Sequence, residues 1–430
     1  MPDRPGASRR WASPAPEPMR AKPPSSKKGF LAAVESVRGI AALYVAVAHT
    51  MIYLLFIHYN APLFDLTGAR EVLIRIAESL IHGPMAVMVF FVISGLVIGR
   101  SLDGQDAALP GGHRYAIFLI RRFLRLYPAH IAALTGIIVI GWLCLHGRPP
   151  IDFSAYQPPD DVYFTDWLQA AFNPLHLKTV VANYAMVRWS MNLVVWSLYV
   201  EVCAAPLLPL FHRISRRNNP ALDTVTTGIL LAVCALAWGH LAVDYWFAFY
   251  LGMIVETRGR AWVSLVTRKF RLAPVAIVSY AVMALPALLF TDRPPYTPML
   301  EALGAFSLIS LVVWCDKATL FRVLDHPLLR WNGRLSYSFY LWHYFILTMA
   351  VRALYLAFSP ALLYENEVVV CALTAAVTVA AALAVARLSY GWIELPFIGF
   401  GRRLASAWQT RHGRARVGRL IDLTQEQAAP

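Results

Sequence analysis

The chain has 430 residues, of which 58% are hydrophobic and only 15% are charged. Since soluble domains carry about a quarter charged residues, this composition excludes an ordinary soluble protein and indicates a polytopic membrane protein. The net charge of +14 would suggest nucleic-acid binding in a soluble protein, but most basic residues here lie between apolar segments. Membrane topology explains that distribution, and we expect no nucleic-acid partner.

The N-terminal segment is rich in Pro, Ser and basic residues and lacks the apolar stretch of a cleavable signal peptide. We therefore expect a disordered basic cytoplasmic tail over residues 1–29. A transmembrane domain is expected over residues 30–400, and a second basic cytoplasmic tail over residues 401–430.

A helix that spans a bilayer needs about 20 mostly apolar residues. The hydropathy pattern predicts an all-α polytopic membrane protein with about ten transmembrane helices. The fifth and sixth of these helices are short and are joined by a tight connection. The predicted spans are 31–57, 80–99, 123–145, 191–211, 222–238, 241–256, 272–290, 300–315, 335–357 and 366–387.

The basic residues predict the orientation of the chain in the membrane. The great majority of the 39 Lys and Arg residues lie in the two tails and in alternate loops. Because such residues collect on the cytoplasmic side, both termini are predicted to be cytoplasmic. The longest loop on the opposite side, 146–190, is aromatic and acidic, which suits a sugar ligand and equally suits an interfacial cap.

The first predicted span, which contains "VESVRGIAALYVAVAHT", carries Glu35, Arg38 and His49. Arg38 and His49 lie eleven positions apart, so they share one helix face, with an axial rise of about 16 Å. Ionisable groups inside a membrane are costly and usually mark a functional site. A purely structural interpretation pairs Arg38 with Glu35, but it leaves His49 unexplained.

Two further polar features flank the second and third spans. The second span contains Ser94 in "FFVISG", which by itself is typical of helix packing. The third is preceded by Arg121, Arg122 and Arg125, of which the last two share a helix face. Guanidinium groups bind phosphates with two parallel hydrogen bonds, although such arginines also serve simply as cytoplasmic anchors.

The fourth and ninth spans also contain polar side chains. Trp196 and Glu201 belong to "WSLYVE", and a carboxylate within a span is a candidate site residue. Tyr340 and His343 belong to a polar stripe in "LSYSFYLWHYF". His343 is either a neighbour of a catalytic group or a hydrogen-bonded core histidine.

These segments, taken in order, resemble five sequence blocks of the membrane acyltransferase 3 family. The blocks are "VESVRGIAALYVAVAH", "FFVISGLVIGRSL", "RRFLRLYP", "WSLYVE" and "LSYSFYLWH", and the resemblance covers roughly residues 30 to 400. One departure is Pro84 in "HGPMAVMV", where family members commonly carry a polar residue.

The resemblance implies a ten-helix integral membrane enzyme that moves an acyl group, above all acetyl, from cytosolic acyl-CoA to a hydroxyl of a carbohydrate or glycolipid acceptor on the extracytoplasmic side. It also implies a multi-pass protein of the bacterial inner membrane that takes part in O-acetylation of polysaccharides or related acceptors. By motif match, Arg38, His49, Arg122 and Arg125 are functional, and Trp196 and Glu201 are implicated as well.

From these residues we expect the following chemistry. The three arginines before the third span would hold the CoA phosphates, and Arg38 would polarise the thioester carbonyl or position the pantetheine. His49 would act as general base or form an acyl-histidine intermediate, and Glu201 or His343 would orient it. The remaining supporting residues are Glu35, Ser94, Trp196 and Tyr340. We expect no permanently bound cofactor and no metal, since the five cysteines show no metal-ligand spacing.

Three other functions remain open at this point. Charges within spans also line the pathways of transporters, so one alternative is a transporter or flippase of acyl groups or glycolipids without chemistry of its own. A membrane glycosyltransferase is less consistent with the sequence, because the early loop from 58 to 79 has no adjacent acidic pair. An inactive family member is disfavoured by the presence of both Arg38 and His49.

Overall fold

The computed structural model describes residues 26–55, 66, 68–104, 111–148, 172, 175–290, 294–316, 318–408 and 410. These residues form helices and their connections, and none of them lies in a strand. The prediction of an all-α polytopic membrane protein is therefore confirmed. The helices are α1 (Ser26–Leu54), α2 (Ala69–Leu80), α3 (Gly83–Asp103), α4 (Gly111–Leu145), α6 (Leu177–Tyr184), α7 (Val195–Ala204), α8 (Leu208–Ser215), α9 (Pro220–Leu236), α10 (Trp246–Ile254), η3 (Val255–Gly259), α11 (Arg260–Lys269), α12 (Leu272–Leu289), α13 (Tyr296–Trp314), η4 (Thr319–Asp325), α14 (Pro327–Ala357), α15 (Pro360–Glu365), α16 (Glu367–Ser389) and η5 (Tyr390–Glu394).

Within the described ranges, seven helical segments are long and apolar enough to cross a membrane. The predicted fourth span is instead the pair α7 and α8, bent by 62° at a break that contains Pro206, which has no backbone N–H to continue a helix. The predicted fifth and sixth spans correspond to α9, with 17 residues, and α10, with only 9. Each of the ten predicted spans thus has a helical counterpart, while the number ten stays a prediction.

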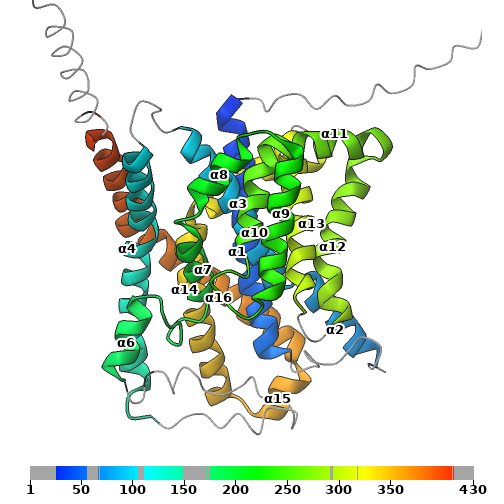
Figure 1. Ribbon diagram of the computed structural model, residues 1–430. Helices are drawn as coiled ribbons and strands as arrows, with labels where there is room; N and C mark the ends of the chain where they lie inside the picture. The colour runs from blue at the N-terminus through cyan, green and yellow to red at the C-terminus, as the bar shows by residue number, and fades with distance from the viewer. Residues whose placement is uncertain are drawn as a thin grey trace, which may run out of the picture.

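The two described ends of the chain, at the start of α1 and at the end of the helix that reaches Trp408, lie on the same side of the bundle (Figure 1). This agrees with the even number of crossings that the sequence predicts. The cytoplasmic assignment of that side stays a prediction. The predicted N-terminal tail up to residue 25, residues 411–430 and most of the predicted loop 146–190 lie outside the described residues.

The most extensive helix pair is α1 with α14, and it crosses at glycines. A Cβ atom on Gly39 would lie 2.7 Å from the backbone nitrogen of Gly333, and one on Gly333 would lie 1.9 Å from the carbonyl oxygen of Glu35. The amide of Asn332 donates a hydrogen bond of 2.8 Å to the carbonyl of Gly39 at the same crossing. These glycines therefore let the two helix backbones approach closely, and the crossing fixes the height of Arg38, the neighbour of Gly39.

A second glycine crossing joins α3 to α10. A Cβ atom on Gly95 would lie 2.0 Å from the carbonyl oxygen of Phe249, and one on Gly252 would lie 2.0 Å from the carbonyl oxygen of Val92. Backbone therefore touches backbone at this crossing. The contact sets the position of α3 and hence of Ser94 on that helix.

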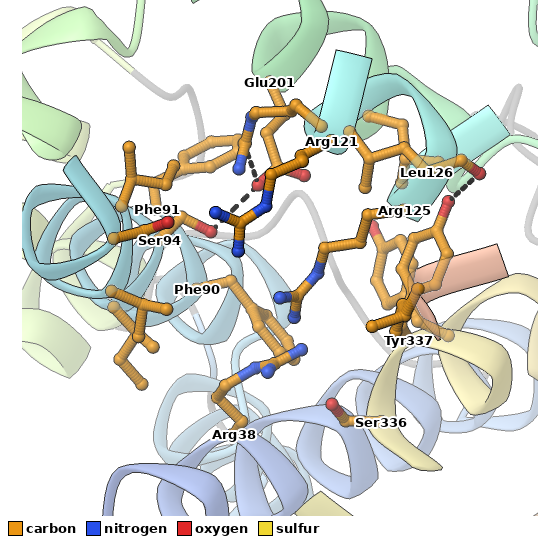
Figure 2. Close-up of a pocket in the computed structure, with 18 of the residues that line it drawn as sticks. Arg38, Phe90, Phe91, Ser94, Arg121, Arg125, Leu126, Glu201, Ser336 and Tyr337 are labelled. Atoms are coloured by element: carbon orange, nitrogen blue, oxygen red, sulfur yellow. Dashed lines mark hydrogen bonds and ion pairs between the residues drawn. The ribbon is translucent and has the colours of Figure 1, made fainter. Parts of the chain in front are cut away.

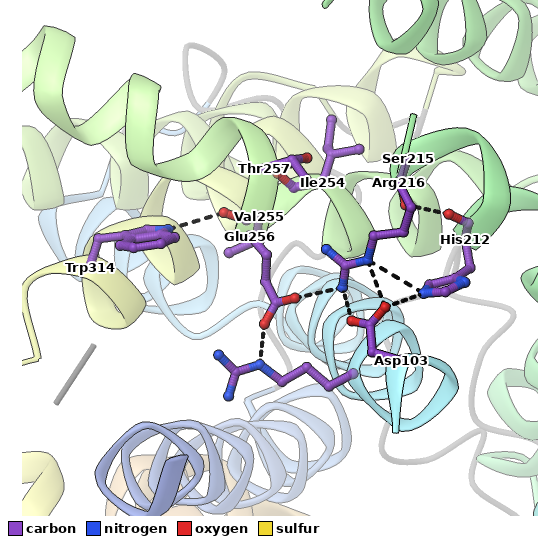
Figure 3. Close-up of polar contacts among 10 residues, drawn as sticks. Asp103, His212, Ser215, Arg216, Ile254, Val255, Glu256, Thr257 and Trp314 are labelled. Atoms are coloured by element: carbon purple, nitrogen blue, oxygen red, sulfur yellow. Dashed lines mark hydrogen bonds and ion pairs between the residues drawn. The ribbon is translucent and has the colours of Figure 1, made fainter. Parts of the chain in front are cut away.

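Ion pairs join three segments near the C-terminal end of α3 (Figure 3). Arg216 of α8 bonds to Asp103 of α3 and, at 2.7 Å, to Glu256 of η3. Glu256 also bonds to Arg100, and the ring of His212 lies 2.8 Å from Asp103. Each of the two arginines here contacts a carboxylate, so this cluster is a neutralised junction between the helices.

Replacement of Gly95 by Ala is predicted to destabilise the bundle by about 1–3 kcal/mol, because the new methyl group meets backbone that has to move. Gly228 of α9 is the matched control, since a Cβ atom there would meet nothing within 4 Å. Thermal unfolding of the purified protein in detergent measures both variants. Equal melting temperatures for Gly95→Ala and Gly228→Ala would contradict the crossing.

Candidate active site

A cavity of about 190 Å³ lies between α1, α3, α4, α7, α14 and the helix that follows η5 (Figure 2). Seven of the residues predicted for the site line it, and four others do not, namely Glu35, His49, Trp196 and His343. The seven lining residues are Arg38, Ser94, Arg121, Arg122, Arg125, Glu201 and Tyr340.

The cavity is elongated along α3. Its lining on α3 extends from Ser101, near the end of the helix, to Val87, which corresponds to about 21 Å along the helix axis. Ser101 belongs to the last turn of α3, and this C-terminal end of α3 points toward the side of the bundle where the described termini lie (Figure 1). The lining on α14 reaches down to Tyr340. The shape suits an extended chain that enters from the side predicted to be cytoplasmic.

The lining carries an excess of positive charge. It contains five arginines and one carboxylate, that of Glu201. Glu201 accepts hydrogen bonds from Arg122 and, at 3.0 Å, from Ser94. The four other guanidinium groups have no ion pair with any described residue; we call them the cavity arginines, and they are Arg38, Arg121, Arg125 and Arg402.

The structural interpretation of the sequence requires an ion pair between Arg38 and Glu35, and the structure has no such pair. Among the described charges that act on Arg38, Glu35 has the smallest effect. The guanidinium of Arg38 instead lies in the cavity, facing that of Arg125 (Figure 2). Pairing with Glu35 is therefore not the reason for this arginine.

The sequence analysis missed Glu394, which lies in the π-helical turn η5. Its side chain is buried, accepts a hydrogen bond of 2.8 Å from Ser338 and acts electrostatically on Arg125 and Arg38. Glu394 follows the last predicted span, where a carboxylate attracts no notice. The letters "SYGWIELPF" do carry the signal, since an acidic residue in an apolar segment is unusual.

His49 and His343 form a hydrogen-bonded pair. The Nδ1 atom of His49 lies 3.1 Å from the Nε2 atom of His343, and the ring planes differ by 8°. His343 donates its Nδ1 proton to the carbonyl oxygen of Tyr340, at 2.8 Å, because a carbonyl only accepts. A neutral His343 then accepts at Nε2, so the proton of His49 sits on Nδ1. The Nε2 atom of His49 is left with a free lone pair, as a general base requires.

Only one of the two predicted partners of His49 contacts it. Glu201 is bound to Arg122 and Ser94, at the level of the arginines, whereas His343 touches His49 directly. His343 is therefore hydrogen-bonded in the core and lies next to His49, while the catalytic role of that pair stays a prediction.

A layer of aromatic rings separates the histidine pair from the cavity. The ring of Tyr340 lies 5.5 Å from that of His343 and 6.0 Å from that of Phe90, centre to centre. The hydroxyl of Tyr340 donates to the carbonyl of Val194 at 3.1 Å and lies 2.9 Å from that of Ser197. The cavity therefore reaches Arg38 but ends about one helical turn short of His343.

Trp196 lies behind the cavity wall, not in it. Its ring packs at 6.3 Å from Phe91 and 5.6 Å from Tyr245. The residue therefore supports Phe91, which lines the cavity.

No group of three or more His, Cys, Asp or Glu side chains in the described ranges is placed to hold a metal ion. The five cysteines are all free thiols. The chemistry available here consists of guanidinium groups, a carboxylate and an imidazole pair.

A family model described as an acyltransferase domain matches residues 31–387 of the chain. The match includes every predicted site residue and stops before Glu394 and Arg402. No curated protein and no solved structure matches the chain.

Replacement of Glu201 by Ala is predicted to cost about 3 kcal/mol of stability, because Arg122 loses its carboxylate while only 10% of its side chain is exposed. The thermal unfolding of the detergent-purified variant measures this loss. Glu35→Ala is the matched control, since that carboxylate makes no ion pair with a described residue, and its loss is expected to stay below about 1 kcal/mol. Equal losses in the two variants would contradict the assigned pair.

Proposed function

Since the chain belongs to the acyltransferase 3 family of membrane enzymes, we propose that it transfers an acetyl group from cytosolic acetyl-CoA to a hydroxyl of a carbohydrate-containing acceptor. The acceptor lies on the extracytoplasmic side of a bacterial inner membrane. Membership of the family makes the chain a membrane-bound acyltransferase; the donor, the acyl group and the acceptor are the proposal.

The excess of unpaired guanidinium groups in the cavity is the observation that carries this proposal. Four cavity arginines that have no ion pair with a described residue favour a ligand with several negative charges, and CoA carries phosphate groups at its nucleotide end. The inner part of the cavity, lined by Phe90 and Tyr340, suits the uncharged pantetheine arm. With the nucleotide at the Ser101 end, the thioester would arrive beside Phe90 and Tyr340.

His49 and His343 supply the proton chemistry of the proposed reaction. The Nε2 atom of His49 takes the proton of the acceptor hydroxyl while that oxygen attacks the thioester carbonyl. The carbon–sulfur bond then breaks, the CoA thiolate leaves and the proton on His49 neutralises it. His343 keeps the lone pair of His49 on Nε2 through the hydrogen bond at Nδ1. An acyl-histidine intermediate would use the same Nε2 atom as a nucleophile.

The aromatic layer supports a short acyl group. Phe90 and Tyr340 line the inner part of the cavity, and the hydroxyl of Tyr340 is held by Val194 and Ser197. An acyl chain that reaches the histidine pair has to pass this layer, and each additional CH₂ group needs further room. Acetyl needs the least.

His49→Ala is predicted to lower transfer by at least about 10²-fold, because the variant lacks the base. The measurement is mass spectrometry of surface glycans and lipids from cells that make each variant, read as loss of the acetyl mass increment. His240→Ala, which removes an exposed histidine that does not line the cavity, is the control. Full transfer by a correctly inserted His49→Ala protein would refute the base role. In cells that lack the protein altogether, an unchanged glycan and lipid profile would favour the transporter alternative.

Phe90→Ala is predicted to lower the preference for acetyl-CoA over butyryl-CoA by roughly tenfold, since each newly accommodated CH₂ group contributes about 0.8 kcal/mol. The ratio of the two initial rates in one preparation measures this preference and is independent of the amount of folded protein. Phe123→Ala, which removes an exposed ring from α4, is the control. An unchanged ratio in an active Phe90→Ala protein would place the acyl group elsewhere.

A further inference from the structure

Two of the cavity arginines lie at its outer end and come from distant parts of the chain. Arg121 belongs to α4, and Arg402 belongs to the helix that continues after η5 to Trp408. Both line the cavity, and their guanidinium groups act on one another electrostatically. Neither has an ion pair with a described residue. Arg402 falls in the segment that the sequence analysis assigned to a cytoplasmic tail.

Packing fixes this C-terminal helix against α4. Gly401 is buried, and a Cβ atom there would lie 3.4 Å from the Leu124 side chain and 3.9 Å from the Cα atom of Arg121. One helical turn further on, Ala405 packs on Ile117 together with Trp408. These contacts form one stripe along the helix, so the position of Arg402 relative to Arg121 is set by the fold.

Adjacent like charges without a counter-charge repel one another, and a bound dianion removes that repulsion. A phosphate monoester offers oxygens to two guanidinium forks at once. The neighbouring residue Arg403 is also exposed but does not line the cavity. Within the basic segment, Arg402 therefore lies beside Arg121 in the cavity, and Arg403 does not.

The position of Arg121 and Arg402 along the cavity indicates which part of CoA would lie beside them. Arg125 lies one turn further along α4 from Arg121, and Arg38 faces Arg125 from α1. A CoA thioester with its acyl end at Tyr340 would place its pantetheine arm along the inner cavity and its nucleotide at the outer end. The phosphate at the outermost point of CoA is the 3′-phosphate of its ribose.

We propose that Arg121 and Arg402 form a binding site for the 3′-phosphate of CoA. This inference rests on the proposed function, because it presumes an acyl-CoA donor. The site selects acyl groups carried by the complete nucleotide over those carried by phosphopantetheine alone. The C-terminal helix is then part of the donor site and not only a cytoplasmic tail.

Isothermal titration of the full-length protein in detergent with CoA and with 3′-dephospho-CoA tests the site. The wild type is expected to bind CoA roughly 10- to 30-fold more tightly than 3′-dephospho-CoA, as the loss of a charged hydrogen-bonded contact implies. Arg402→Gln is expected to weaken CoA binding by a similar factor and to leave the affinity for 3′-dephospho-CoA near the wild-type value. Arg403→Gln, which removes the adjacent charge outside the cavity, is expected to retain wild-type affinity for both ligands.

The outcomes separate this inference from the proposed function. If Arg402→Gln weakens both ligands equally, or neither, the 3′-phosphate assignment is overturned. The same holds if the wild type binds CoA and 3′-dephospho-CoA equally tightly, although an acyl-CoA donor then remains. If the wild type binds neither ligand, the proposed donor itself is wrong.

Discussion

Unneutralised positive charge inside an apolar helix bundle is the constraint on which this structure depends. One arginine at the centre of a membrane costs about 3 kcal/mol on insertion scales. The cavity holds four arginines without an ion pair to a described residue, of which Arg38 and Arg125 lie deepest. Such an arrangement requires rigid packing around it and a ligand of opposite charge. The backbone contacts at Gly39–Gly333 and Gly95–Gly252 supply the packing. In the nearby cluster of Arg216, Asp103 and Glu256, by contrast, the charges are paired with one another.

Tyr340 joins the cavity to the histidine pair. Its ring lines the cavity, its hydroxyl is held by α7 and its carbonyl oxygen receives the proton of His343. A movement of this residue would therefore change access to His49 and the orientation of its ring together. That linkage gives a physical reason why a thioester would meet the base only once it has filled the cavity.

The long spans of the fold were readable from the sequence, because apolar length alone marks them. The break between α7 and α8 was not predicted, although Pro206 signals it. Site residues were predicted where charge interrupts an apolar run, as at Arg38 and His49. The contact of His49 with His343, 294 positions away, depends on helix register, which no local pattern encodes. Arg402 went unnoticed for the opposite reason, since a charge in a basic segment is ordinary until the fold places it beside Arg121.

The central claim is that a cytosolic thioester passes along the cavity arginines toward an imidazole that lies beyond the inner end of the cavity. A cryo-electron microscopy structure of the full-length protein with a non-hydrolysable acetyl-CoA analogue tests this claim most directly. The account predicts phosphate density among the cavity arginines and the acetyl group beside Phe90 and Tyr340, facing the Nε2 atom of His49. An analogue bound outside the cavity, or with its acetyl end directed away from His49, would contradict it.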